Sequence, residues 1–381
     1  MKIGIITHPL AYNYGGLLQN YALQTVLKRM GHQPITLNPD PHIPLKFKKW
    51  ILSLPKRIAY KYYLKLPRIH FFEEFSANKI RRIIMQNLQP FIDKHINYIN
   101  VKDFANLKND GYEALIAGSD QIWRPPYVQP IEKGFFFFAE NWRNIKRLSY
   151  AASFGTDEWE YSLEQTANCK RLIHLFDSVS VREESGIELC QKYFGVKAVH
   201  VLDPTMLLSK DDYVELIRES NVPDSSGDLL NYILDETSDK LALLNKLISD
   251  KGLTPFRVNG KPEGGYPMNE RIQPPMESWL KGFYDAKFVM TDSFHACAFS
   301  IIFNKPFIVY ANKQRGYARF QSLLKMFGLE NRLIYKIEDY DGITDGIDWN
   351  RVNMIMRQKQ MDAMRFLNDA LSIKVESKKS L

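Results

Sequence analysis

The stretch TDSFHACAFSIIFNKPFIV (291–309) holds the clearest candidate for chemistry, a single histidine, His295, after an apolar strand pattern. Small apolar residues follow it and predict a helix that packs closely on a sheet. An imidazole titrates near pH ~6.5, so it can donate or accept a proton at neutral pH. A lone histidine is more often structural, but a place between a strand end and a helix start favours catalysis. We predict that His295 is catalytic and acts on an anionic substrate at this helix start.

Cationic side chains follow two other predicted strands. In SVSVREESG (178–186), Arg182 comes after an apolar strand, where its guanidinium fork suits a carboxylate or a phosphate. The two glutamates after it are an alternative, structural partner. Three further cations follow the strand pattern PFIVYA (306–311), and they either complete the anion site or are plain surface charge. The predicted donor-binding residues are Arg182, Ser293, Lys313, Arg315 and Arg319.

Two polar turns in the first half of the chain suit an acceptor with hydroxyl groups. In AGSDQIW (117–123), Asp120 could orient or deprotonate a hydroxyl, and we predict it as a second catalytic residue. Its alternative is a helix N-cap. In THPLAYNYGG (7–16), a glycine pair opens a helix whose free N–H groups could face an anion or a hydroxyl, or could form a simple tight turn. The predicted acceptor-binding residues are Asn13, Gly15, Gly16, Gln19 and Trp123.

The elements that must position these residues alternate between strands and helices, which predicts parallel α/β sheets. A Pro/Ser/Gly/Asp-rich segment at 219–228 divides the chain into Rossmann-type domains at 1–220 and 221–381. The first carries a basic helical insertion at about 40–86, and GFFFFA (134–139) is expected to be one of its strands. The second ends in a long helix expected to pack back on the first. Ligands of such sheets bind beyond the carboxyl ends of the strands, so we expect one cleft between the domains.

Composition restricts the class of protein. The chain has 381 residues, long enough for two domains, and no apolar run of the ~20 residues that a membrane span needs. We expect no signal peptide at the start. Cys169, Cys190 and Cys297 have no metal-ligand spacing, so we predict a reducing, cytoplasmic setting and no metal.

Much of the net charge of +8 is local. Residues 46–68 carry eight Lys or Arg interleaved with aromatic residues and include no acidic residue. The pattern is typical of contact with an anionic membrane surface, and a solvated basic face is an equal alternative. No nucleic-acid-binding motif accompanies it, so we predict no nucleic acid partner.

The sequence resembles the polysaccharide pyruvyl transferase family. The matching pieces run in the family's order between residues 12 and 333, and they are YNYGGLLQNYALQ, AGSDQIW, YAASFG, SVREESG, VLDPTMLL, TDSFHACAFSIIFNKPFI and RFQSLLKMFGLENRL. The resemblance implies a GT-B-like fold, two Rossmann-type domains facing across a cleft. It also implies a basic residue at Arg182 and a histidine at His295 around the donor. Better-known members carry a second arginine two residues before that histidine, where this chain has Ser293. Either a later cation substitutes for it or donor binding differs.

The activity that the resemblance implies is transfer of a pyruvyl group from phosphoenolpyruvate to two hydroxyls of a sugar, which gives a cyclic pyruvate ketal. Such enzymes serve capsule, exopolysaccharide or cell-wall glycan synthesis and need no cofactor. A lipid-linked acceptor would place the protein at the inner face of the cytoplasmic membrane. Two alternatives stay open: a GT-B glycosyltransferase that uses a nucleotide-sugar, and a non-catalytic glycan-binding assembly protein.

Overall fold

The computed structural model describes residues 1–42, 73–311, 317–340 and 346–372. Its first half is built on a parallel five-stranded sheet with the order β3-β2-β1-β4-β5. This is the strand order of a Rossmann-type domain. The strands are β1 (Lys2–Ile6), β2 (Gln33–Pro39), β3 (Tyr98–Val101), β4 (Ala114–Ala117) and β5 (Lys146–Ser149).

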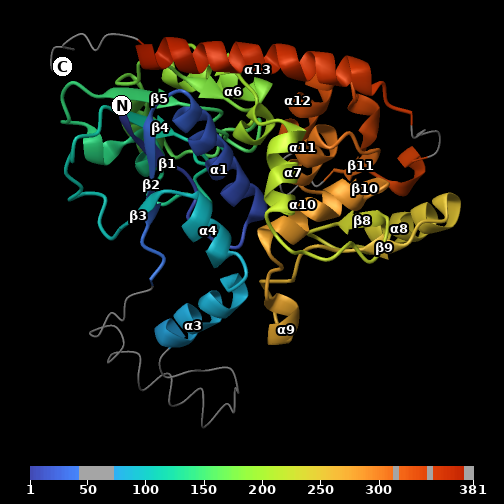
Figure 1. Cartoon of the computed structure of the whole chain (residues 1–381). Coiled ribbons are helices and arrows are strands. Elements are labelled where there is room, and N and C mark those ends of the chain that lie inside the picture. The colour runs from blue at the N-terminus through green and yellow to red at the C-terminus, as the bar shows by residue number, and fades with distance from the viewer. Residues whose placement is uncertain (43–72, 312–316, 341–345, 373–381) are drawn as a thin grey trace.

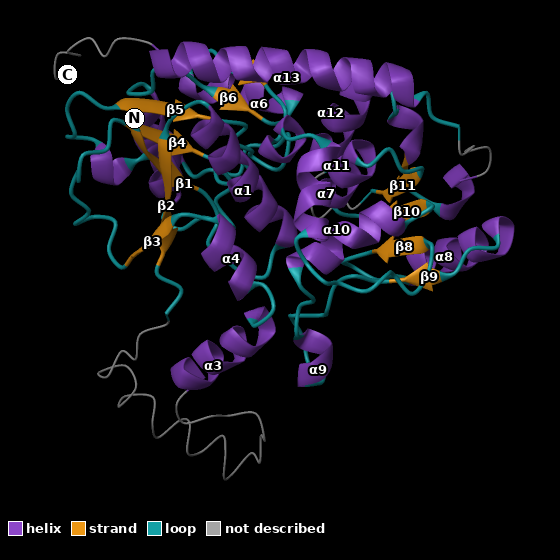
Figure 2. Cartoon of the chain, in the orientation of Figure 1, coloured by secondary structure: helices purple, strands orange, loops and turns teal. Residues whose placement is uncertain are grey.

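The second half is built on another parallel five-stranded sheet, in the order β12-β11-β10-β8-β9, which is the other common order of doubly wound sheets. Figure 2 shows the two groups of strands apart from each other, each with helices around it. The predicted fold class, two Rossmann-type domains, is therefore confirmed. The strands are β8 (Leu229–Tyr232), β9 (Pro255–Phe256), β10 (Phe288–Thr291), β11 (Phe307–Tyr310) and β12 (Leu333–Ile334).

A short parallel pair connects the two halves along the chain. It consists of β6 (Ser180–Val181) and β7 (Val199–His200), and bridges such as Ala152 to Val181 place it beside the first sheet. The central strands β1, β4, β8 and β10 are almost wholly buried. Burial on both faces is expected for parallel strands covered by helices on each side.

Local signals in the sequence set many of the helix ends. The helix after β1 has Asn13 as N-cap, two others begin with capping boxes at Ser162 and Ser209, and one ends at Gly252 in the left-handed conformation. The helices of the first half are α1 (Tyr14–Arg29), α3 (Glu73–Met85), α4 (Gln89–His95), α5 (Leu163–Ile173), α6 (Glu184–Leu189) and α7 (Lys210–Arg218). Those of the second half are α8 (Ser238–Lys251), α9 (Met268–Arg271), α10 (Met276–Asp285), α11 (Phe294–Ile302), α12 (Ala318–Phe327) and α13 (Trp349–Ser372).

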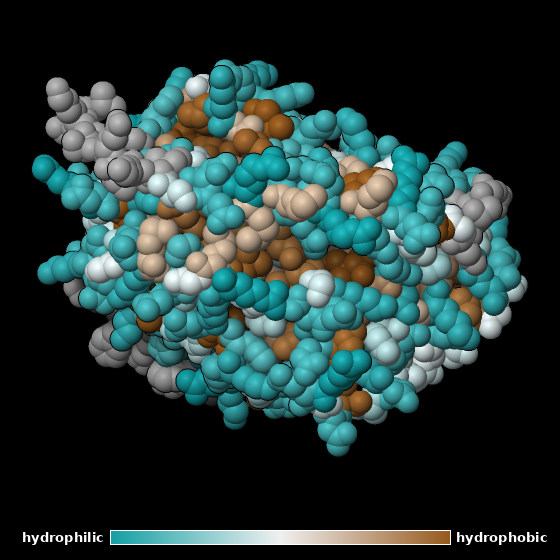
Figure 3. Space-filling view, turned by 45° about the horizontal axis from the view of Figure 1, so that its top comes forward, coloured by the Kyte–Doolittle hydropathy of each residue, from teal (hydrophilic) through white to brown (hydrophobic). Residues whose placement is uncertain are grey.

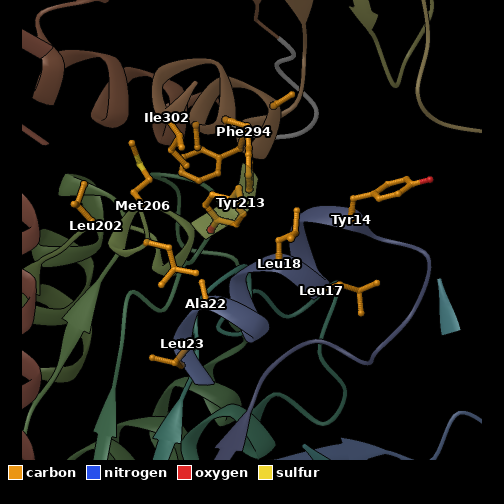
Figure 4. Packing of buried hydrophobic residues seen from close by; sticks show 14 of the residues in the cluster. Tyr14, Leu17, Leu18, Ala22, Leu23, Leu202, Met206, Tyr213, Phe294 and Ile302 are labelled. Atoms are coloured by element: carbon orange, nitrogen blue, oxygen red, sulfur yellow. The ribbon is translucent and has the colours of Figure 1, made fainter. Parts of the chain in front are cut away.

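One apolar core joins the two halves. Figure 4 shows side chains of α1, including Leu18, near Tyr213 of α7 and Phe294 of α11, and all belong to one buried cluster. The ring of Tyr213 lies 4.9 Å from that of Phe299 in α11. Thus α7, which precedes the predicted boundary, packs on the second half. The shared core fixes the first turns of α1 and α11 next to each other.

The C-terminal helix α13 runs across both halves (Figure 1). Its Phe366 ring lies 6.4 Å from that of Tyr150, next to β5, and the side-chain amide of Gln360 donates to the Met206 carbonyl at 2.8 Å. It also contacts α12 of the second half. The helix therefore bridges the two domains on the outside of the molecule.

The predicted strand GFFFFA is wrong. Residues 134–139 lie in two 3₁₀ turns, Ile131–Phe135 and Phe137–Ala139, joined by Phe136 in the left-handed conformation at φ 61°. The phenylalanines do not alternate between two faces of a sheet, because several pack into one aromatic cluster. Phe135 stacks on Trp123 with ring centroids 4.9 Å apart, and Phe136 stacks on Phe176 at 5.0 Å.

The face in Figure 3 is mostly polar, with apolar residues in separate patches. Among the described residues, no helix is both long and apolar enough to span a membrane. The basic segment 46–68 lies outside the described residues, and of the predicted insertion the structure describes residues 40–42 and the chain from Glu73 onward.

Candidate active site

A cleft of about 860 Å³ lies between the two domains, beyond the carboxyl ends of both sheets. Segments that follow β1 and β4 line one side, and segments that follow β8, β9 and β10 line the other. This is the place where open α/β sheets bind ligands. The polar and charged residues that line it include His8, Asn13, Asp120, Tyr127, Arg257, Ser293, His295 and Arg319.

His295 lies in the first turn of α11, at the floor of the cleft. The residue is 7% exposed, and its Nε2 has no hydrogen-bond partner among the described residues. The nearest carboxylate oxygen, Oδ2 of Asp203, is 3.8 Å from Nε2. Burial lowers the pKa of His295, and the carboxylates of Asp203 and Asp120 oppose this shift. The imidazole is therefore neutral at pH 7 and keeps one ring nitrogen available to a ligand.

Gly15 of α1 packs directly against His295 across the domain boundary. A Cβ added to Gly15 would lie 2.1 Å from Nδ1 of His295, closer than any side chain could tolerate. Two helices of the two domains thus begin at the same end of the cleft, α1 at Tyr14 and α11 at Phe294. The Ser293 side chain makes no capping bond to α11. Helix starts carry N–H groups and a partial positive charge, so this end of the cleft favours an anion.

The turn that leads into α11 is fixed by a buried ion pair. Asp292 accepts from Nζ of Lys240 at 2.7 Å and from the backbone N–H of Leu234 at 2.7 Å and of Asp235 at 3.1 Å. These bonds tie the end of β10 to the loop that follows β8. The backbone that presents Ser293 and His295 is therefore held from two sides.

Arg182 pairs with buried carboxylates of the protein and not, as predicted, with a donor anion in the cleft. Its side chain is 1% exposed and does not line the cleft. One terminal nitrogen donates to Asp203 at 2.9 Å and the other to Asp120 at 3.2 Å. Its guanidinium also lies 4.3 Å from the centre of the Phe294 ring. Arg182 is thus the buried counter-ion of two carboxylates beneath the cleft, and we assign it a positioning role.

Asp120 lines the cleft in a left-handed backbone conformation, at φ 68°. Burial would raise the pKa of its carboxyl group, but Arg182, then His8, His295 and Arg319, outweigh burial and lower the pKa well below its usual range. A carboxylate that is so reluctant to take a proton is a poor base at neutral pH. The prediction that Asp120 deprotonates a hydroxyl is therefore revised, and its carboxylate supplies a fixed negative charge instead.

Asp203 is a central residue of the site that the sequence did not single out. Its Oδ2 accepts from Ser119 at 2.8 Å as well as from Arg182, and its Oδ1 accepts from the backbone and hydroxyl of Thr205. Burial opposes ionisation, but the His295 ring, the Arg182 guanidinium and these hydrogen bonds lower its pKa. The segment VLDPTMLL offered a usable sequence signal for Asp203, because this aspartate closely follows a strand.

Arg319 is the cation that the structure brings to the cleft beside His295. It lies in the first turn of α12, is 6% exposed and has its guanidinium 5.8 Å from the Phe294 ring centre. Burial and the nearby Arg182 lower the pKa of Arg319 to about 10, so it stays charged at neutral pH. The other two predicted cations of this segment, Lys313 and Arg315, lie outside the described residues.

The predicted acceptor residues divide into two groups. Asn13 and Gly15 line the cleft. Gly16 does not, and its N–H donates to the Asn13 side chain at 3.2 Å. Gln19 is wholly buried and donates to the Thr7 hydroxyl at 2.6 Å. Trp123 is wholly buried too, with its indole N–H on the Gly134 carbonyl at 3.0 Å. The predictions that Gln19 and Trp123 contact an acceptor are wrong, because neither side chain reaches the cleft.

Several cleft residues were missed by the sequence analysis, among them a histidine and an exposed tyrosine. His8 follows β1 by two residues, and Tyr127 is 51% exposed on the same wall. Position after a strand was the usable signal for His8, whereas Tyr127 lies in an irregular segment with no such signal. In the described ranges, no group of three or more His, Cys, Asp or Glu is placed to hold a metal ion.

Comparison with known proteins decides the family. The model of the polysaccharide pyruvyl transferase family matches residues 13–314, more than half of the chain. This chain belongs to the polysaccharide pyruvyl transferase family. Of the family-matching residues that line the cleft, Asp120 and His295 come from opposite domains. No curated protein matches the chain.

Several solved structures resemble the whole chain at low identity. The S. aureus MnaA–UDP co-structure is 12% identical with a TM-score of 0.49, over 100% of this chain and 99% of its own. The UDP-GlcNAc 2-epimerase from Neisseria meningitidis bound to UDP-GlcNAc is 10% identical with a TM-score of 0.47, over 97% of this chain and 99% of its own. E. coli ADP-heptose lps heptosyltransferase II is 10% identical with a TM-score of 0.36, over 94% and 100%. No ligand or reaction is carried over from these structures.

Proposed function

We propose that this member of the polysaccharide pyruvyl transferase family transfers the pyruvyl group of phosphoenolpyruvate to two hydroxyls of one sugar and forms a cyclic ketal. The observation that carries the proposal is the anion-favouring end of the cleft, where two helix starts, Arg319 and His295 converge. Phosphoenolpyruvate carries a phosphate and a carboxylate, so it suits such a site.

Donor binding would use Arg319 and the helix starts. A guanidinium can bind a carboxylate or a phosphate through two parallel hydrogen bonds. Arg319 thereby supplies the charge that Ser293 lacks, while the unengaged Ser293 hydroxyl adds a neutral hydrogen bond. Lys313 and Arg315 remain predicted donor contacts. Arg182 acts from below the cleft by holding Asp120 and Asp203 in place.

His295 is the proposed general acid. It protonates the methylene carbon of the donor, which makes C2 electrophilic, and the first sugar hydroxyl forms a bond to C2 and loses its proton. The C2–O bond to phosphate then breaks, and phosphate leaves with the electron pair. The second hydroxyl attacks C2, gives its proton to the His295 imidazole that the first step left neutral, and closes the ketal. The imidazole is neutral in the free protein, so it must take up a proton when the anionic donor binds, and the Asp203 and Asp120 carboxylates favour that imidazolium form.

The biological setting follows from the family and stays a proposal. The product would be a pyruvylated glycan of a capsule, an exopolysaccharide or a cell wall, and the acceptor a free or lipid-linked sugar. A lipid-linked acceptor would require work at the inner face of the cytoplasmic membrane. The basic segment 46–68 would assist there, at about 1 kcal/mol per cation near an anionic surface. Liposome flotation that charge reversal in this segment leaves unchanged would contradict that role.

The test is phosphate release from phosphoenolpyruvate with galactose-, glucose- and mannose-containing acceptors, both free and lipid-linked. We expect release only when a suitable acceptor is present, and a new methyl singlet in the proton NMR spectrum of the product. A parallel series replaces phosphoenolpyruvate with nucleotide-sugars. Nucleotide release in that series, with no phosphate release in the first, would overturn the proposal in favour of a glycosyltransferase.

A further inference from the structure

The proposed reaction leaves one role without a residue. Each of the two acceptor hydroxyls must lose a proton, and Asp120 is a poor base because the Arg182 guanidinium holds its carboxylate ionised. His295 gives one proton to the donor carbon and can take back only one of the two. A base on the acceptor side must therefore come from elsewhere on the cleft wall.

His8 is placed for this role. It lies in the loop after β1, is half-buried and lines the same cleft as Asp120 and His295, but from the first domain. We infer that His8 is the general base of the acceptor: it takes the proton of the attacking hydroxyl as the O–H bond breaks and the oxygen bonds to C2 of the donor. The Asp120 carboxylate is the counter-ion of the imidazolium that results. This inference rests on the proposed function.

A rigid stack of side chains holds the His8 ring in place. The His8 and Tyr127 rings meet edge to face, with centroids 6.4 Å apart at 84°. The guanidinium of Arg124 lies 5.2 Å from the Tyr127 ring centre. Arg124 is in turn fixed by two bonds to Glu160, at 2.8 Å and 2.9 Å, and by one to Gln121 at 3.0 Å. These contacts restrict the orientations open to the His8 ring, and a fixed orientation favours proton transfer.

The same stack offers a binding surface for a sugar. Tyr127 is 51% exposed, lines the cleft and borders His8. An exposed aromatic ring is a large, rigid and amphipathic contact surface. A sugar ring that lies on Tyr127 would bring its hydroxyls to the imidazole. Tyr127 is therefore the acceptor-side aromatic residue that the sequence analysis sought in Trp123.

The charges around His8 suit a base. Burial lowers its pKa, and so do the cations Arg182, Lys133 and Arg319, whereas Asp120 raises it. The net shift is downward, so the ring is neutral at pH 7 and can accept a proton. The rate should then fall as the pH drops through the pKa of His8, because protonation removes the base.

The test compares His8→Gln with His32→Gln. His32 is a matched control, because it also has a pKa lowered by burial but lies at the start of β2, at the opposite edge of the sheet. We expect His8→Gln to lower kcat by about 10²–10⁴-fold and to remove the acid limb of the pH–rate profile. Affinity for phosphoenolpyruvate, measured by calorimetry without acceptor, should stay near wild type. Unchanged melting temperatures show that both variants fold.

Tyr127 gives a second, independent readout. Tyr127→Ala should raise the acceptor KM and leave the phosphoenolpyruvate KM unchanged, while Tyr127→Phe should restore the acceptor KM because the ring face remains. Acceptor-dependent phosphate release by wild type that His8→Gln retains, acid limb included, would overturn this inference alone. Wild-type protein that releases no phosphate with any acceptor would overturn the proposed function, and this inference with it.

Discussion

The two strand-to-helix crossovers that meet at the cleft occupy matching places in the two domains. One leads from β1 to α1 and the other from β10 to α11, and each follows the central strand of its sheet. Each delivers one histidine. His8 lies in the loop, two residues after β1, whereas His295 lies inside the first turn of α11.

The difference in position sets the surroundings of the two rings. His295 is held in the helix, only 7% exposed and in contact with Gly15, with Asp203 as the nearest carboxylate. His8 is half-buried on a loop, beside an exposed aromatic ring. The same fold unit therefore holds one histidine tightly enclosed, as proposed for the donor side, and the other beside open space, as proposed for the acceptor side. The degree of enclosure depends on whether the histidine precedes the helix or lies within its first turn.

The largest expected effect comes from removing the helical histidine. His295→Gln should lower kcat by about 10²–10⁴-fold, because it removes the proposed general acid and leaves the fold intact. Acceptor-dependent phosphate release is the measurement, and a thermal melt checks folding. Turnover close to wild type would take His295 out of the mechanism and leave the two crossovers without distinct roles.

Loss of the buried arginine beneath both crossovers should act on stability first. Arg182→Met leaves Asp120 and Asp203 buried without their counter-ion, which costs about 3–5 kcal/mol of the free energy of unfolding. Urea denaturation measures it. The matched control is Arg218→Met, whose pair with Glu215 is exposed and is worth about 0–1 kcal/mol. Equal stabilities of the two variants would contradict the positioning role of Arg182.

The contact between the crossovers can be tested at a single glycine. Gly15→Ala would bring a Cβ to within 2.1 Å of Nδ1 of His295, so the imidazole must move. A displacement of about 1 Å costs on the order of 10²-fold in rate. In the neighbouring control Gly16→Ala, the Cβ approaches the Asn13 side chain only to 3.3 Å, and we expect nearly full activity. If both variants kept wild-type rates, tight enclosure of His295 would not matter.

The smallest expected effect is a change in protonation on donor binding. Burial lowers the pKa of His295 in the free protein, and a bound anion should raise it. Binding of phosphoenolpyruvate should therefore take up a proton, and its affinity should fall as the pH rises. Calorimetry in two buffers with different ionisation enthalpies measures this uptake. His295→Gln should lose most of the proton uptake and His8→Gln should keep it. If His8→Gln lost the uptake and His295→Gln kept it, the proposed roles of acid and base would have to be exchanged.

The sequence analysis succeeded where a local pattern carries the information. The parallel sheets, the helix around His295 and the strand-end positions of Asp120 and Arg182 all follow from apolar periodicity and turn residues. It failed at GFFFFA because an aromatic run has the same composition in a strand and in an aromatic cluster. Only the folded chain shows that Trp123 lies inside this cluster rather than on the cleft.

By itself, the sequence determined that the chain forms two α/β domains and that His295 stands at a helix start. Both depend on the order of neighbouring residues. The tertiary structure alone decided which charges meet. Arg182 forms ion pairs with Asp120 and Asp203, which are 62 and 21 residues away in the sequence. Gly15 packs against His295 of the other domain. Such pairings depend on which strand ends face one cleft, and a linear pattern of residues does not contain that arrangement.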